Sequence, residues 1–167
     1  MELTGRVWIF GDEINTDLIF PHSAFRASPE EQLKLVFSDN RPGWSALVTP
    51  GDILVAGTNF GTGSSRPGAA LLKRLGLAAL VCESINGLFF RNCISYGFPA
   101  LACPGASKIF REGDDARIDL LKGTVVNVRT NESRTGCPLS PAMAEILEAG
   151  GIEPVLIKKG YINKEEV

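Results

Sequence analysis

The segment DILVAGTNFGTGSSRPGAALLKRLGLAALVC, residues 52–82, contains the pattern that decides the fold. An apolar run at Asp52–Ala56 is followed by a glycine-rich turn at Gly57–Ser65 and a helical pattern at Pro67–Leu75. Leu77–Cys82 is again continuously apolar, as expected of a strand that is covered on both faces. The segment therefore predicts two parallel strands joined by a right-handed crossover helix.

The same alternation continues on both sides of this segment. Downstream, Ile85–Tyr96 predicts a second helix and Phe98–Cys103 another buried strand. Upstream, Arg6–Phe10 predicts a short strand, and the Ser-Pro-Glu-Glu start of Ser28–Phe37 predicts a capped helix. The stretch Asp39–Gly51, which carries prolines and glycines, is predicted to be a loop.

The last third of the chain is richer in β patterns. Ala116–Leu120 and Thr124–Thr130 flank a good hairpin turn and predict two antiparallel strands. Ser140–Ala149 predicts a capped helix, and Glu153–Lys158 a last short strand. We therefore expect one α/β domain over residues 1–167, with a mainly parallel sheet flanked by helices and a β-rich flank.

Composition and charge exclude several classes of protein. The 167 residues are 44% hydrophobic and carry a net charge of −2, which excludes a disordered chain. There is no basic block of the kind that binds nucleic acid. No apolar run approaches the roughly 20 residues that cross a membrane. The start, MELTGRVWIFGDE, lacks the features of a signal peptide, so we expect a cytoplasmic protein with neither nucleic-acid nor membrane partners.

The four cysteines do not have the spacing of a metal site. None forms a C-x-x-C pair, and the single histidine, His22, lies far upstream of them. Cys82, Cys93 and Cys103 lie in apolar runs, which favours free, buried thiols. We expect this chain to hold no metal, so that any metal chemistry would need ligands from another chain.

The glycine-rich turn is the strongest candidate for a binding site, because it lies where a strand passes into a helix. The glycines of Gly61–Gly63 permit close approach to the backbone, and Ser64 or Ser65 is placed to cap the helix. Free amides of this turn beside Arg66 would bind an anion, and an arginine can grip a carboxylate with two parallel hydrogen bonds. A tight turn and a capped helix without a ligand remain the alternative.

The spacing of this turn does not match three familiar motifs. Arg66 stands where a dinucleotide-binding fingerprint needs its third glycine. Ala69 stands where a phosphate-binding loop needs lysine, and Pro67 stands where a nucleophile elbow at Ser65 needs its second glycine. An anion site of a different kind is therefore indicated.

Three ordered stretches of the chain resemble the signatures of one family. NFGTGSSR, residues 59–66, resembles the N-[FY]-G-x-G-S-S-R signature of the swivelling domain of the aconitase superfamily. FGDEINTDLIFP, residues 10–21, and FFRNCISYGFP, residues 89–99, resemble stretches of the small subunits of 3-isopropylmalate dehydratase. The resemblance covers nearly the whole chain and implies a swivelling-type domain.

The resemblance implies roles for individual residues. By position, Ser64 would be the base that removes a proton α to a carboxylate, while Ser65 and Arg66 would bind the substrate carboxylate. Asp17 would be an active-site acid residue. The loop after it would recognise the substituent at the substrate's Cγ, through His22, Ala24, Phe25 and Arg26.

The resemblance also implies an activity and a partner. The chain would be the small subunit of a hydro-lyase that interconverts 2- and 3-isopropylmalate, a step of leucine biosynthesis. A serine is a poor base unless its alkoxide is stabilised and the proton is acidified by an electrophile. In the family that electrophile is a four-iron four-sulfur cluster held by the large subunit. This chain would bind no cofactor and would be inactive alone.

Departures from the family pattern leave the substrate open. Thr62 stands where the family usually has cysteine, and Pro67 and Gly68 stand in place of Glu-His. Alternatives are the same chemistry on homoaconitate, methylmalate or dimethylmalate, or a carboxylate-binding module without enzymatic activity. Phe25 offers an apolar surface for an alkyl substituent, whereas Arg26 would pair with an extra carboxylate unless it points to solvent.

Overall fold

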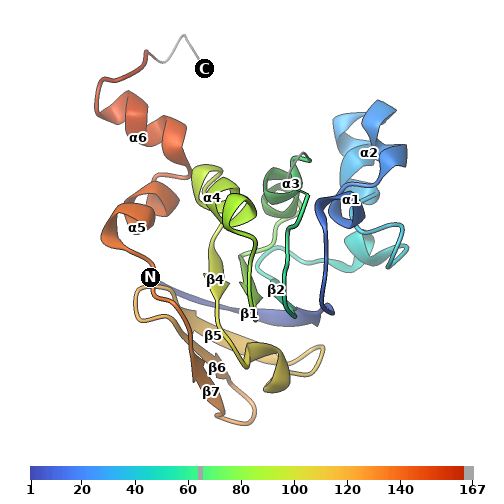
Figure 1. Ribbon diagram of the computed structural model, residues 1–167, viewed down its shortest axis with the longest axis vertical. Coiled ribbons are helices and arrows are strands. Elements are labelled where there is room, and N and C mark those ends of the chain that lie inside the picture. The colour runs from blue at the N-terminus through green and yellow to red at the C-terminus, as the bar shows by residue number, and fades with distance from the viewer. Residues whose placement is uncertain (64–65, 164–167) are drawn as a thin grey trace.

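The structure, a computed structural model, describes residues 1–63 and 66–163 (Figure 1). Within these residues seven strands form one sheet in the order β4-β3-β2-β1-β5-β6-β7. The strands are β1 Glu2–Ile9, β2 Ile53–Ala56, β3 Ala79–Cys82, β4 Ala100–Ala102, β5 Asp115–Asp119, β6 Thr124–Asn127 and β7 Ser133–Thr135. The α-helices are α1 Thr16–Ile19, α2 Pro29–Lys34, α3 Gly68–Arg74, α4 Gly87–Ser95, α5 Pro141–Glu148 and α6 Ile152–Lys158. Short 3-10 helices span η1 His22–Arg26, η2 Trp44–Leu47 and η3 Ala106–Lys108.

The strands from β1 to β4 form the parallel half of the sheet, which confirms the predicted α/β class. Val55 of β2 pairs with Ile9 on one side and Val81 on the other. Every residue of β2 and β3 is buried, which explains their continuously apolar sequences. The helices α3 and α4 make the predicted crossovers between these strands.

Strand β1 joins the parallel half to an antiparallel flank. Its last residues pair with β2, while the residues from Glu2 to Arg6 pair with β5. The predicted strand Arg6–Phe10 was therefore too short. Exposed residues alternate with partly buried ones from Glu2 to Arg6, so this half lacks an apolar run that would mark it.

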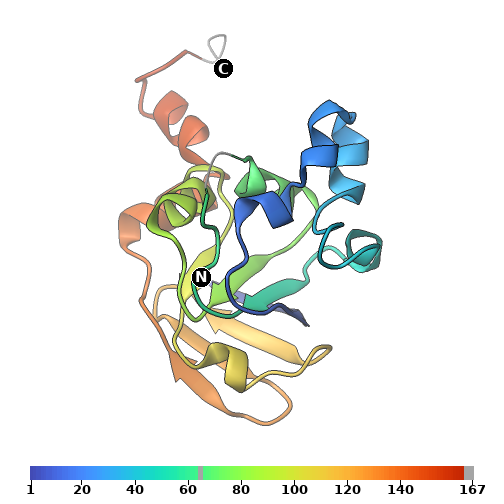
Figure 2. The ribbon, with the colours of Figure 1, turned by 45° about the vertical axis from the view of Figure 1, so that its right-hand side comes forward.

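The antiparallel flank contains the predicted hairpin of β5 and β6, in which Ile118 pairs with Val125. The third strand, β7, was not predicted, because its residues Ser133, Arg134 and Thr135 carry no apolar signal. Figures 1 and 2 show this flank at one end of the molecule and the helices α1–α4 at the other.

Four predicted helices, now α2 to α5, are confirmed with shorter bounds. Ser28 caps α2 by accepting from the Glu31 backbone N–H, and the Glu31 side chain completes a capping box by accepting from the Ser28 backbone N–H. Pro67 precedes α3 at the N-cap position, so it does not lie in the first turn as expected. The predicted loop Asp39–Gly51 contains η2. No helix within residues 1–63 and 66–163 is long and apolar enough to cross a membrane.

The predicted strand Glu153–Lys158 is wrong, because this segment forms the helix α6. Ile152, Val155 and Leu156 have helical spacing, and Val155 is buried. Pro154 is tolerated because it lies in the first turn, where backbone N–H groups have no partner within the helix.

The core consists of two apolar clusters on the two faces of the sheet. Leu54 and Ala56 of β2 belong to one cluster, whereas Ile53 and Val55 belong to the other. The predicted buried thiols are confirmed for three free cysteines, namely Cys82, Cys93 and Cys103. Burial raises the pKa of each of them, to about 11 for Cys103.

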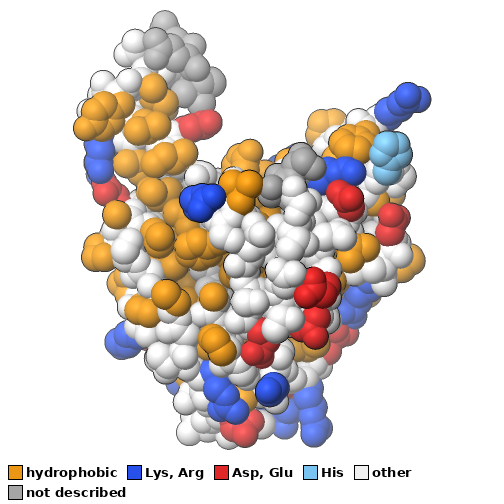
Figure 3. Space-filling model, in the orientation of Figure 1, with side chains coloured by type: hydrophobic (Ala, Val, Ile, Leu, Met, Phe, Trp, Pro, Cys, Tyr) orange, Lys and Arg blue, Asp and Glu red, His pale blue; other side chains and the backbone are white. Residues whose placement is uncertain are grey.

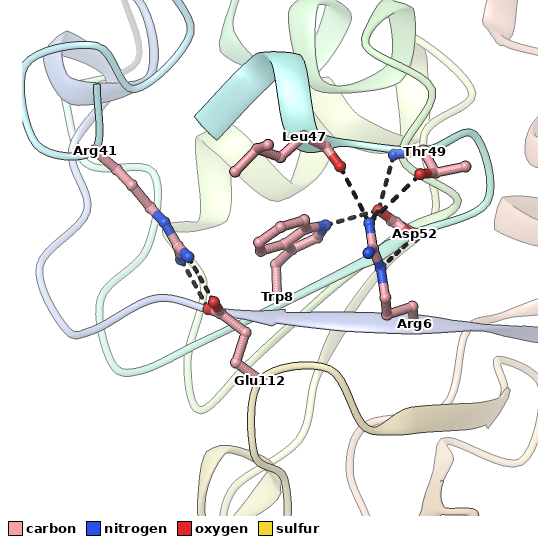
Figure 4. Close-up of polar contacts among 7 residues, drawn as sticks. All are labelled: Arg6, Trp8, Arg41, Leu47, Thr49, Asp52 and Glu112. Carbon is pink, nitrogen blue, oxygen red and sulfur yellow. Dashed lines mark hydrogen bonds and ion pairs between the residues drawn. The ribbon is translucent and has the colours of Figure 1, made fainter. Parts of the chain in front are cut away.

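A polar cluster connects β1 to Asp52, the residue before β2 (Figure 4). The Asp52 carboxylate accepts hydrogen bonds from Arg6 Nη2 at 2.7 Å, Trp8 Nε1 at 2.7 Å and the Thr49 backbone N–H at 2.9 Å. Arg6 and Arg41 both lie over the Trp8 ring, with guanidinium carbons 4.8 and 5.1 Å from its centroid. This cluster fixes the position of β1 against the loop that precedes β2.

Replacing Asp52 with asparagine is expected to lower the free energy of unfolding at pH 7 by about 1–3 kcal/mol, because charged hydrogen bonds are lost. Burial alone raises the pKa of Asp52, but the hydrogen bonds from Arg6, Thr49 and Trp8 outweigh it and leave the pKa lowered. The stabilisation is therefore present above the unfolded pKa of about 3.9 and is lost as pH falls through the folded pKa.

Urea unfolding of both proteins between pH 3 and 7 measures this effect. The gap between wild type and Asp52→Asn should close toward pH 3. The exposed Asp39→Asn control should match wild type throughout. A gap that is independent of pH would assign the loss to packing, not to the ionised carboxylate.

Candidate functional site

The site forms where two loops leave neighbouring parallel strands. Since β1 and β2 pair in parallel, the segments that follow them meet at the same edge of the sheet. Backbone hydrogen bonds join these segments, among them those from Gly57 N to Gly11 O at 3.0 Å, Glu13 N to Thr58 O at 2.9 Å, Gly61 N to Ile14 O at 2.7 Å and Thr16 N to Thr62 O at 2.8 Å. Two of the sequence signatures therefore form a single paired structure.

Side chains reinforce this pairing of loops. Asp12 Oδ1 accepts from both the backbone N–H and the hydroxyl of Thr58, and these hydrogen bonds lower the pKa of Asp12. Asn59 donates to Glu13 Oε2 at 2.6 Å, and both residues have positive φ angles, 58° and 57°. The strained turn is thus held by polar contacts on both of its sides.

Two glycines of the turn are required by their surroundings. Gly61 and Gly63 have φ angles of 83° and 92°, which favour glycine. A side chain at Gly61 would collide with the Phe89 ring, and a Cβ at Gly63 would lie 2.9 Å from Thr16 Oγ1. The backbone amide of Gly61 already donates to Ile14, so the expectation that this amide binds an anion is wrong.

Thr16 is a polar residue of the site that the sequence did not single out. It is fully buried, and its Oγ1 has no hydrogen-bond partner among the described residues. This oxygen lies next to Gly63, at the last described position before residues 64 and 65. A buried hydroxyl without a partner is costly unless a ligand or neighbouring group satisfies it. The one sequence signal for Thr16 is its position in the Asn15-Thr16-Asp17 part of the signature.

Arg66 and Asp17 are brought together as an ion pair, with Arg66 Nε donating to Asp17 Oδ1 at 3.0 Å. The Arg66 side chain is 14% exposed, whereas that of Asp17 is 66% exposed. Arg66 Nη1 is buried and has no hydrogen-bond partner within the part of the chain that the structure describes. The guanidinium therefore keeps a desolvated donor beside the glycine turn, suited to a carboxylate oxygen.

The loop after Asp17 forms η1 and contributes unequally to the site. Phe25 lies against Arg66, whose guanidinium carbon is 4.1 Å from the ring centroid. Ala24 is fully buried in the core, so its side chain offers no surface to a substrate. Arg26 is exposed and lines a separate pocket of about 390 Å³ beside α2. His22 is exposed and touches the Phe25 ring, with centroids 5.2 Å apart. Figure 3 shows the single histidine in pale blue near basic, acidic and hydrophobic side chains.

Ser64 and Ser65, the expected base and carboxylate-binding serine, lie outside the described residues. The structure describes their neighbours on both sides, Gly63 and Arg66.

Helix α3 begins two residues after Arg66, at Gly68. A Cβ at Gly68 would lie 3.1–3.3 Å from side-chain atoms of Phe89 and Ile19, so a larger residue there would require these side chains to shift by a few tenths of an ångström.

This chain does not provide a fitting site for an iron–sulfur cluster within the described residues. Three of its cysteines are buried with raised pKa values, and thiolates are the form that binds iron. No group of three or more His, Cys, Asp or Glu side chains in residues 1–63 and 66–163 is arranged to hold a metal ion.

Comparisons with known proteins show which proteins this chain resembles. The profile of the aconitase C-terminal domain family matches residues 23–104. The chain is 42% identical to the isopropylmalate/citramalate isomerase small subunit of Methanocaldococcus jannaschii, over 94% of this chain and 95% of the relative. It is 40% identical to 3-isopropylmalate dehydratase small subunit 1 of Methanopyrus kandleri, over 95% and 94% of the two chains.

The fold also matches a solved structure over its whole length. The crystal structure of 3-isopropylmalate dehydratase from Methanocaldococcus jannaschii covers 100% of both chains, with a TM-score of 0.87 and 31% sequence identity. The similarity in sequence and in fold thus points to the same group of proteins.

Proposed function

This chain belongs to the family of 3-isopropylmalate dehydratase small subunits, and on that premise we propose that it serves a hydro-lyase that interconverts 2- and 3-isopropylmalate. The reaction removes water from one isomer and adds it back in the opposite orientation, as a step of leucine biosynthesis. The enzyme works in the cytoplasm, and residues 1–167 act as one swivelling-type domain. The small-subunit names of the relatives imply a larger partner.

The main observation in support of this proposal is the environment of the Arg66 guanidinium. Its guanidinium is largely buried, is paired with Asp17 through Nε and keeps Nη1 unpaired among the described residues. Arginine binds a carboxylate most strongly through two parallel hydrogen bonds in a desolvated site. A malate skeleton carries such carboxylates, and Arg66 would hold one of them with help from Ser65.

Ser64 would remove the proton α to the bound carboxylate. Its alkoxide would be stabilised by the Arg66 charge and by the amide of Gly63. Thr16, whose hydroxyl lies beside Gly63, would complete the polar surroundings of this base. Asp17 would keep Arg66 in place between turnovers.

The large subunit would supply the Lewis acid that makes the substrate proton acidic, a four-iron four-sulfur cluster. The cysteines of the small subunit do not fit that role, so the two chains divide the chemistry between them. The part of this chain is to bind, orient and deprotonate the substrate.

Assays of the two-subunit complex with several substituted malates test the proposal. We expect the highest kcat/KM for isopropylmalate, with citramalate also measured because the Methanocaldococcus relative is named for both. A preference for homoaconitate would replace the proposed substrate. Carboxylate binding by the isolated chain, with no turnover of any of these by the complex, would favour a non-enzymatic module.

Arg26 is expected to set the preference between alkyl and carboxyl substituents. It is exposed at the separate pocket beside α2 and forms none of the ion pairs among the described residues, so it can pair with an additional carboxylate of a substrate that reaches this pocket. Replacing Arg26 with alanine should lower kcat/KM for homoaconitate relative to isopropylmalate by about 10- to 150-fold, the effect of one charged hydrogen bond. An unchanged ratio would place this selectivity in the large subunit.

A further inference from the structure

We propose that Phe25 is a positioning residue for Arg66, because its ring forms the surface on which the carboxylate-binding guanidinium lies. The substrate-recognition loop and the carboxylate-binding arginine then act as one unit. This inference rests on the proposed function, since Arg66 is the group that Phe25 would orient.

The contact between the two side chains is close. The Arg66 guanidinium carbon lies 4.1 Å from the Phe25 ring centroid, well inside the roughly 6 Å at which a cation is attracted to an aromatic face. A planar guanidinium also stacks on a ring, which an ammonium group cannot do. The Arg66 side chain is only 14% exposed, whereas Phe25, the other partner in this contact, is 51% exposed. The arrangement therefore shields the arginine more than the phenylalanine.

The Phe25 ring is itself held by aromatic neighbours. It meets Phe20 edge-on, with centroids 5.5 Å apart and an interplanar angle of 88°. His22 meets it at 5.2 Å and 80°. Phe20 is only 3% exposed and belongs to the core cluster, so it links the ring to the rigid part of the fold. Edge-to-face pairs of this kind favour one orientation of the ring.

The contacts of Arg66 leave one nitrogen of its guanidinium available to bind a ligand. Asp17 occupies Nε, and Phe25 lies against the guanidinium face. Nη1 is buried without a partner among the described residues. Asp17 is an exposed carboxylate on a short helix. It restrains one edge of the Arg66 guanidinium but does not fix the orientation of the guanidinium plane. Contact with the ring supplies that second restraint, which a bidentate carboxylate contact needs.

The competing role for Phe25 is to contact the alkyl substituent directly. The two roles make different predictions. A positioning residue affects every malate equally, since all of them present the same carboxylate to Arg66. A residue that contacts the substituent affects large alkyl groups and spares unsubstituted malate.

The first test uses the isolated chain and does not depend on turnover. NMR of wild type, Phe25→Leu and Phe25→Tyr should show ring-current shifts of the Arg66 side-chain protons that vanish in the leucine variant and return in the tyrosine variant. Arg66 resonances that are the same in all three proteins would overturn the proposal.

The second test uses the two-subunit complex. Phe25→Leu should raise KM for isopropylmalate and the inhibition constant of malate by the same factor, about 3- to 10-fold, with kcat little changed. Phe25→Tyr should restore both constants. The matched control Tyr96→Leu, at a side chain of similar exposure (49%) on α4, should behave as wild type.

The outcomes are distinguishable. A loss confined to isopropylmalate, with the malate constant unchanged, would overturn the positioning role and assign Phe25 to the substituent. A loss in kcat alone would overturn it as well. An inactive wild-type complex would refute the proposed function, while the Arg66 resonances would still decide whether Phe25 orients the arginine.

Discussion

Ser64→Ala in the two-subunit complex is expected to lower kcat by about 100- to 10,000-fold, the usual contribution of a general base. The hydroxyl is removed, but Arg66 and the glycine turn remain, so the substrate should bind with nearly unchanged affinity. Steady-state kinetics with isopropylmalate, together with the inhibition constant of malate, separate the two effects.

A matched control tests whether the loss is chemical. Ser133→Ala makes the same change at an exposed residue of β7 and should retain wild-type kinetics. Thermal unfolding of both variants checks that the fold is intact. Near-normal turnover in Ser64→Ala would rule out the base assignment.

Arg66→Lys should lower kcat/KM by about 10- to 150-fold, which corresponds to the loss of about 1.5–3 kcal/mol from a charged hydrogen bond. Lysine keeps the positive charge but cannot present a planar fork. It therefore cannot pair with Asp17, lie flat on Phe25 and hold a carboxylate with two bonds at the same time. We expect KM to rise as well as kcat to fall.

The exposed Arg117→Lys on β5 is the corresponding control, and it should leave both constants unchanged. An unaltered KM in Arg66→Lys would contradict a carboxylate-binding role for this arginine. It would then be an ion-pair partner that only supports the Asp17 loop.

The elements of the fold that could be predicted from the sequence are those with a strong local signal. Buried runs predicted β2 and β3, and serine caps predicted the starts of α2 and α5. Strand β7 has only polar residues and depends on pairing with β6, which no local pattern encodes. Helix α6 was taken for a strand because a short apolar run has no unambiguous period.

The site was predictable in its residue types but not in its contacts. The signatures identified Asp17 and Arg66, yet the ion pair between them depends on β1 and β2 being adjacent in the sheet. The contact of Phe25 with Arg66 and the buried hydroxyl of Thr16 follow from the same adjacency. Residues that are 41 to 49 positions apart in sequence, as these pairs are, give no pairwise signal in a single chain.

The most direct test of the account is to titrate this chain into a cluster-loaded large subunit and to measure isomerisation of 2-isopropylmalate to 3-isopropylmalate. The large subunit should first be shown to be active with a small subunit of established function. We expect no turnover by either chain alone and a rate that reaches a plateau near one small subunit per large subunit. Absence of turnover at every ratio, with a large subunit known to be competent, would contradict the account.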